Sequence, residues 1–120
     1  MSFGKENFLR TRLVHYFQQL DPHTPARWGQ MDAMQAVEHF TDEIAVLSGH
    51  GPQRLHFNTF QAAIGAMHQE LIHFFEVFEK DARLKTRNPF FGELDFDGNV
   101  DLLYTHGLNH LRQFGIEPVE

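Results

Sequence analysis

The chain contains no cysteine, and this absence removes several kinds of chemistry at once. Without thiols the protein has no disulfide bond, no thiolate metal ligand and no cysteine nucleophile. Its fold therefore does not depend on an oxidising compartment, and covalent catalysis by cysteine is excluded.

A long apolar run is also missing. No stretch approaches the roughly 20 apolar residues that a membrane-spanning helix needs. The N-terminal segment MSFGKENFLRTR is charged from its fifth residue and lacks the apolar centre of a signal peptide. We therefore expect a cytoplasmic protein that does not enter a membrane.

Basic residues are in the minority. The sequence has 10 lysines and arginines against 16 aspartates and glutamates, a formal charge of −6. Binding to a nucleic-acid backbone draws on many positive charges that release counterions. We expect no nucleic-acid partner, unless the local basic group of Arg83, Lys85 and Arg87 acts against the mean charge.

Phenylalanine and histidine are the two residue types in excess, with 13 and 9 copies. Phenylalanine at this density suits a compact helical core, because each ring buries a large area. A chain of 120 residues can bury a core of its own, so we expect one domain spanning residues 1–120.

Four segments carry apolar residues at helical spacing. No segment alternates convincingly with period two, so no strand is expected. The pattern predicts an all-α fold, specifically a four-helix bundle. Connections of about ten residues or more are long enough to leave both up-down and crossover topologies open. The predicted helices span about 3–20, 32–48, 59–78 and 95–114.

The ends of these helices carry clear signals. Asp32 and Gln35 have the spacing of a reciprocal capping pair. Gly49 and Gly115 stand where a left-handed residue closes a helix. Gly107 lies inside the last helix, where glycine costs about 1 kcal/mol, and predicts close approach of another backbone.

Two histidines, His106 and His110, lie one turn apart in the last predicted helix, on the border of its apolar stripe. Such a pair can hold one divalent ion with its ring nitrogens. At this histidine content about 0.6 such pairs arise by chance, so two histidines merely flanking a helix remain the alternative.

A third histidine would complete an open metal site, since three imidazoles and a water are typical of catalytic zinc. His39 has the same border position on the second predicted helix, and Glu43, one turn on, could orient its ring or act as a base. Spacing alone does not select His39 over His15, His56 or His68.

Two further patterns favour ordinary roles. Glu70 and His73 match the E-x-x-H pair of di-iron bundles, but those proteins need two copies and the chain has one. Trp28 could line a substrate entrance, although fixing a loop to the bundle end is favoured. Phe90 and Phe91 are expected to plug the bundle rather than contact a ligand.

Three segments resemble the DinB-like superfamily of four-helix proteins, and specifically its DUF1569 branch. They are RWGQMDAMQAVEHF at 27–40, NPFFGEL at 88–94 and THGLNHLRQFG at 105–115. The chain departs from the family pattern at Asn88 and Asn109, where members often have histidine.

The resemblance implies a metal site with one histidine from the second helix and an H-x-x-x-H pair from the fourth. These positions correspond to His39, His106 and His110. It further implies zinc or nickel as the divalent metal and a homodimer. Some relatives are transferases or isomerases that use a low-molecular-weight thiol such as bacillithiol, mycothiol or glutathione.

Two functions from different classes follow. The first is a metal-assisted, thiol-dependent transferase or hydrolase acting on a small molecule of unassigned identity. The second is a non-catalytic helical binding or dimerisation module, with a structural metal or none. The two differ in whether the ion keeps a position open to exogenous ligands.

Overall fold

The computed structural model describes residues 3–118 and is mostly helical in that range. No helix of the described range is long and apolar enough to cross a membrane. The described elements are α1 (Phe3–Thr11), α2 (Leu13–Gln18), α3 (Ala33–Leu47), α4 (Phe60–Lys80), β1 (Thr86–Asn88), β2 (Gly92–Leu94) and α5 (Phe96–Gln113).

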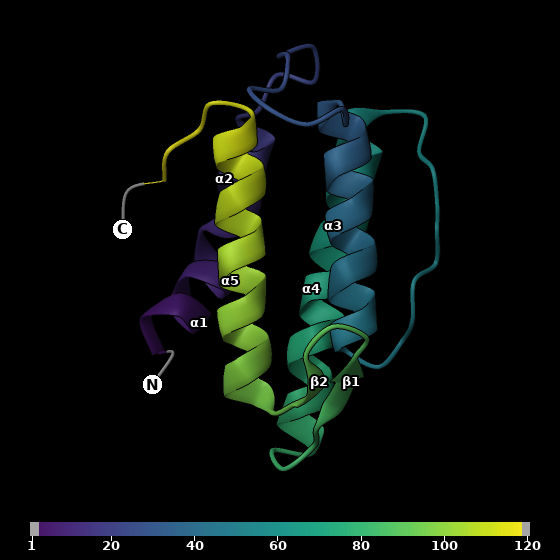
Figure 1. Cartoon of the computed structure of the whole chain (residues 1–120), viewed down its shortest axis with the longest axis vertical. Helices are drawn as coiled ribbons and strands as arrows, with labels where there is room; N and C mark the ends of the chain where they lie inside the picture. The colour runs from purple at the N-terminus through teal and green to yellow at the C-terminus, as the bar shows by residue number, and fades with distance from the viewer. Residues whose placement is uncertain (1–2, 119–120) are drawn as a thin grey trace.

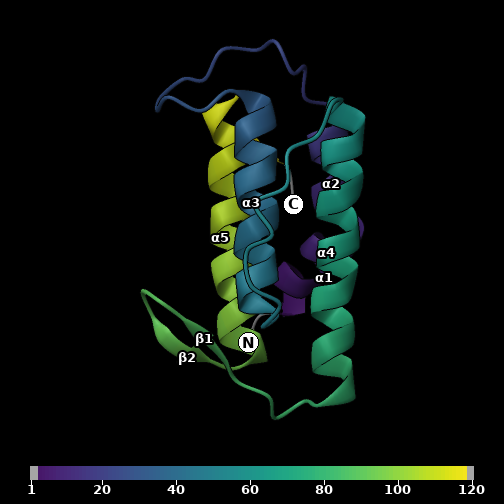
Figure 2. The same cartoon turned by 90° about the vertical axis from the view of Figure 1, so that its right-hand side faces the viewer.

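The three long helices run alongside one another, and α1 with α2 packs against them as a shorter, broken rod (Figure 1, Figure 2). Helix α3 contacts both α4 and α5, and α2 also touches α4 and α5. The molecule measures 41 × 30 × 24 Å along its principal axes. Its elements enclose one shared apolar core.

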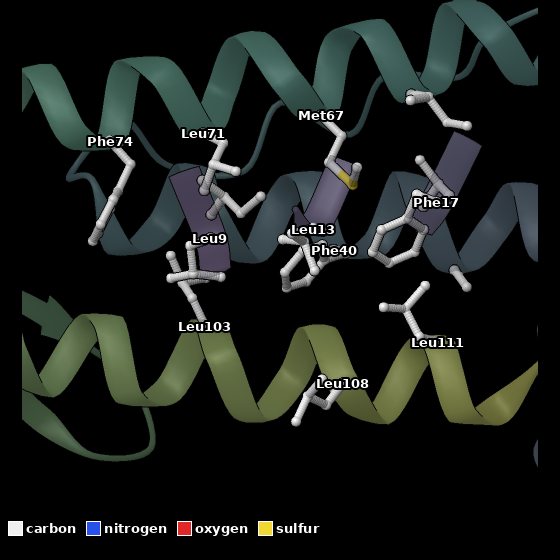
Figure 3. Close-up of a cluster of buried hydrophobic side chains, with 14 of the residues drawn as sticks. Leu9, Leu13, Phe17, Phe40, Met67, Leu71, Phe74, Leu103, Leu108 and Leu111 are labelled. Carbon is white, nitrogen blue, oxygen red and sulfur yellow. The ribbon is translucent and has the colours of Figure 1, made fainter. Parts of the chain in front are cut away.

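The core confirms the apolar stripes read from the sequence. Buried side chains from α1, α2, α3, α4 and α5 form it (Figure 3). In the predicted helix over 59–78, most apolar residues at helical spacing are buried, namely Ile64, Met67, Leu71, Phe74, Phe75 and Phe78. Phe60, at the start of that helix, is only partly buried.

Helix ends also follow the sequence signals. The Asp32 carboxylate accepts from the Gln35 amide at 2.8 Å, while the Gln35 side chain accepts from the Asp32 amide at 3.0 Å. The side chains of Thr59 and Asp95 cap α4 and α5 by accepting from the amides of Ala62 and Gly98. Gly49 and Gly115 have φ of 83° and 86°, the left-handed conformation that glycine allows.

The single helix expected over residues 3–20 is wrong. It is interrupted at Arg12, whose φ of −130° and ψ of −31° leave the helical region. Leu9 and Leu13, on either side of the break, are both fully buried. The sequence has neither glycine nor proline there, so packing against the core decides the break and local propensity does not.

The absence of strands was also a wrong expectation, because residues 86–94 form an antiparallel hairpin. Thr86 pairs with Leu94 in register. Each strand has three residues, too few for period-two alternation to be recognised. The Thr86 hydroxyl donates to the Leu47 carbonyl at 2.6 Å and accepts from Asn99 Nδ2 at 3.0 Å, which ties the hairpin to α3 and α5.

Candidate metal centre

The three histidines singled out in the sequence lie on facing sides of two adjacent helices. His39 belongs to α3, while His106 and His110 belong to α5. These helices lie side by side in both views (Figure 1, Figure 2). The structure therefore brings all three rings to one place.

The small size of Gly107 makes room on α5 for a side chain of α2 and one of α3. A Cβ at Gly107 would lie 2.9 Å from Leu13 Cδ1 and 3.4 Å from Phe40 Cζ. The predicted close approach is thus real, but side chains make it and not another backbone. Phe40 and Gly107 directly follow His39 and His106 in the sequence, so α3 and α5 lie close together next to these two histidines.

Glu43 lies at the centre of the cluster. Its Oε1 is 2.9 Å from His39 Nε2 and 3.4 Å from His110 Nε2. Its Oε2 contacts His106 Nδ1. The sequence indicated only the contact with His39, one helical turn away. The other two depend on the register between α3 and α5, which no local pattern reveals.

The cluster has a buried end and an open end. The His110 side chain is 8% exposed and Glu43 is 19% exposed, whereas His106 and His39 are 37% and 55% exposed. His110 was expected on the border of its stripe, but it is buried against the Phe40 ring, with centroids 5.6 Å apart. One histidine is thus fixed in the interior and two face solvent.

The carboxyl group of Glu43 is ionised despite its burial. Burial alone would raise its pKa, but hydrogen bonds from His106, His110 and His39 together outweigh that cost and hold the pKa far below its ordinary value. The hydrogen bond to Glu43 in turn raises the pKa of His39, against the opposing effect of burial. Glu43 is therefore a mostly buried negative charge that three imidazoles contact.

Gln113 sets the proton position on the buried ring. Its Nε2 donates to the Trp28 carbonyl at 3.1 Å, so its Oε1 faces His110 Nδ1 at 3.3 Å. We assign the Nδ1 proton of His110 on that basis. Nε2 of His110 then faces the Glu43 carboxylate at 3.4 Å, and the two groups attract each other when Nε2 carries a proton or when a metal ion lies between them.

The donor set fits a divalent transition metal. Ligand atoms of His39, Glu43 and His110 all lie within 4.8 Å of one another, so these groups could hold an ion. His106 is not part of that group and instead contacts the other oxygen of Glu43. Imidazole and carboxylate ligands suit zinc and nickel.

Comparisons of the chain with protein-family models, with curated proteins and with solved structures found no match.

A pocket of about 360 Å³ opens over the cluster. Side chains of α3 and α5 form its base, and the hairpin tip forms one wall. Phe90 and Phe91 belong to that wall and are 88% and 60% exposed, so the expectation that they plug the bundle is wrong. Asn88 and Asn109 also line the pocket.

The loop that carries Trp28 is fixed to the end of α5 through its backbone. Arg27 N donates to the Gln113 carbonyl at 2.7 Å, and the Trp28 carbonyl accepts from the Gln113 side chain. The Trp28 side chain itself is half exposed and lies outside the lining of the pocket over Glu43. The loop is therefore fixed to the end of α5 by the backbone of Arg27 and Trp28, and not by the Trp28 side chain.

A second group of potential ligands lies where α3 ends. His50 Nδ1 is 3.0 Å from Glu70 Oε1, and His73 Nδ1 is 3.5 Å from Glu70 Oε2. These three could also hold an ion by distance. Glu70 and His73, the E-x-x-H pair, therefore meet a second histidine, His50, and not the further glutamates of a di-iron site.

The other histidines that spacing left open lie elsewhere. His15 contacts Gln19 at 3.0 Å, and His56 contacts Glu38 at 3.1 Å. His68 lines a different pocket, between α2 and α4. The folded structure, and not the sequence spacing, shows that His39 lies beside His106 and His110 while His15, His56 and His68 do not.

Replacing Gln113 tests its orienting role. We expect Gln113→Leu to weaken zinc binding by about 10- to 100-fold, because the His110 ring loses the acceptor that holds its proton on Nδ1. Isothermal titration calorimetry on the folded variant measures the change. Gln19→Leu, which removes a glutamine from the exposed His15, is the matched control and should bind zinc as the wild type does. Equal affinities for both variants would refute the assignment.

Proposed function

We propose that the chain is a DinB-like four-helix-bundle protein whose His39, His106 and His110 hold one divalent metal ion, zinc or nickel. The observation that supports this most is the surroundings of Glu43. Every ion pair that the described residues give this mostly buried carboxylate is with one of those three histidines, and none is with lysine or arginine.

The arrangement of helices is compatible with the proposed family. Taken together, α1 and α2 occupy one position beside α3, α4 and α5, so that four rods enclose the core (Figure 1). The hairpin is an addition to that plan, inserted between α4 and α5.

We further propose a metal-assisted reaction, that of a thiol-dependent transferase or a hydrolase. A bound zinc or nickel ion would lower the pKa of a coordinated water or thiol toward 7 and so supply a nucleophile at neutral pH. In this proposal His110 anchors the ion from the interior, while His39 and His106 hold it beside the pocket. Glu43 serves as a further ligand or accepts the proton of the nucleophile.

The alternative is a non-catalytic helical module with a structural ion or none. A structural ion is enclosed by protein ligands, whereas a catalytic one keeps a position for water or substrate. The pocket over the more exposed half of the cluster favours the catalytic alternative. The homodimer implied by the resemblance remains a prediction that sedimentation analysis can test.

Cobalt substitution tests the proposed function. We expect one Co²⁺ to bind at the cluster and to produce visible absorption bands that shift when imidazole or a small thiol is added, because the ion is open toward the pocket. The His106→Ala variant should lose the bands, and His68→Ala, on α4, should keep them. Bands that do not shift with either additive would favour a structural ion. The absence of bands would refute the metal centre.

A further inference from the structure

We propose that the pocket over Glu43 takes a small uncharged molecule, with an aromatic or aliphatic group packed against Phe90 and Phe91 and a metal-binding head directed at the histidines. This inference rests on the proposed function, since it needs an ion at the base of the pocket. It adds the class of substrate, which the cluster alone does not define.

The first observation is that two adjacent phenylalanine side chains are exposed to solvent. Phe90 and Phe91 are among the most exposed large apolar residues of the described chain. Each ring forgoes the free energy that burial of its apolar area would supply. Both line the pocket that leads to the histidines, so a ligand lying in it would cover them.

The hairpin fixes the backbone that carries these rings. The Asn88 side chain accepts hydrogen bonds from the amides of Phe90 and Phe91 at 2.7 Å and 3.1 Å. Gly92 completes the turn with a φ of 74°. Thr86 anchors the other end of β1 to the body of the protein. The rings therefore lie at the wall of the pocket before any ligand arrives, which lowers the entropic cost of binding.

The charge of the pocket is the second observation. Its apolar lining includes Val46 and Leu102 besides the hairpin tip, and its only acidic residue is Glu43. No lysine or arginine is among the described residues that line it. A phosphorylated or polycarboxylated molecule would find no lysine or arginine to pair with, only the proposed ion and the histidines that contact Glu43. The volume of about 360 Å³ lies in the range of small-molecule sites.

A pair of matched probes tests the inference on the Co²⁺-loaded chain. We expect 4-phenylimidazole to bind at least about tenfold more tightly than imidazole, because its added ring buries apolar area against the two phenylalanines. In the Phe90→Ala, Phe91→Ala double variant the ratio should fall to within about threefold of unity. Ile72→Ala, which removes an exposed apolar residue of α4 outside this pocket, should keep the full ratio.

The outcomes separate the two proposals. If imidazole shifts the cobalt bands but 4-phenylimidazole binds no more tightly than imidazole, the inference fails and the metal centre stands. If the chain binds no cobalt, both fail. The inference also fails if the double variant turns a dimer into a monomer while the probe ratio stays unchanged, since a second copy would then cover the rings. Benzyl mercaptan should likewise bind more tightly than glutathione, and the reverse order would contradict an uncharged ligand.

Discussion

Zinc-loaded protein is expected to unfold on the order of 10 °C above the metal-free protein. An ion that binds only the folded chain contributes about 4 kcal/mol when its free concentration is a thousand times the Kd, and each kcal/mol raises the midpoint by about 2–8 °C in domains of this general size. His110→Ala should remove the whole increase, because it deletes the buried ligand. Thermal unfolding monitored by circular dichroism measures the increase in the midpoint.

The control for that experiment is His15→Ala. His15 is an exposed histidine of α2, outside the cluster, and its loss should leave the zinc-dependent increase intact. The midpoint of metal-free His110→Ala must be measured as well, since truncating a buried ring leaves a cavity and lowers stability by itself. An equal response to zinc in both variants would mean that the ion binds elsewhere.

Glu43→Gln is expected to weaken zinc binding at least about a hundredfold, more than the loss of an orienting partner usually does. The change keeps the size of the side chain but removes the negative charge that contacts all three histidines. Competition with a chromophoric chelator measures the affinity. Glu70→Gln makes the same change at the second group and should leave the affinity of the first unchanged. A Glu43→Gln chain that binds zinc normally would show that this carboxylate has no part in holding the ion.

Much of the helical framework could be predicted because its signals are local. The capping pair of Asp32 and Gln35 and the closing glycines Gly49 and Gly115 depend on residues within one turn. The interruption at Arg12 could not be predicted, because it depends on packing against side chains that are distant in sequence. The hairpin escaped detection for another reason, namely strands of only three residues.

The candidate site was predictable in its residue types but not in its geometry. One-turn spacing placed His106 with His110 and His39 with Glu43. It did not reveal that Glu43 contacts all three histidines, since that contact depends on how α3 and α5 are aligned. Phe90 was expected to plug the bundle, but the turn of the hairpin holds it in an exposed position.

The metal content of the chain tests the central claim most directly. Protein purified without an affinity tag should be loaded with zinc, dialysed and subjected to elemental analysis, in a Glu70→Gln background that removes the second group of ligands. We expect about one ion per chain to remain, and His110→Ala in the same background to retain none. Loss of the ion from the Glu70→Gln chain, or its retention after His110→Ala, would contradict a metal centre built on His39, His106 and His110.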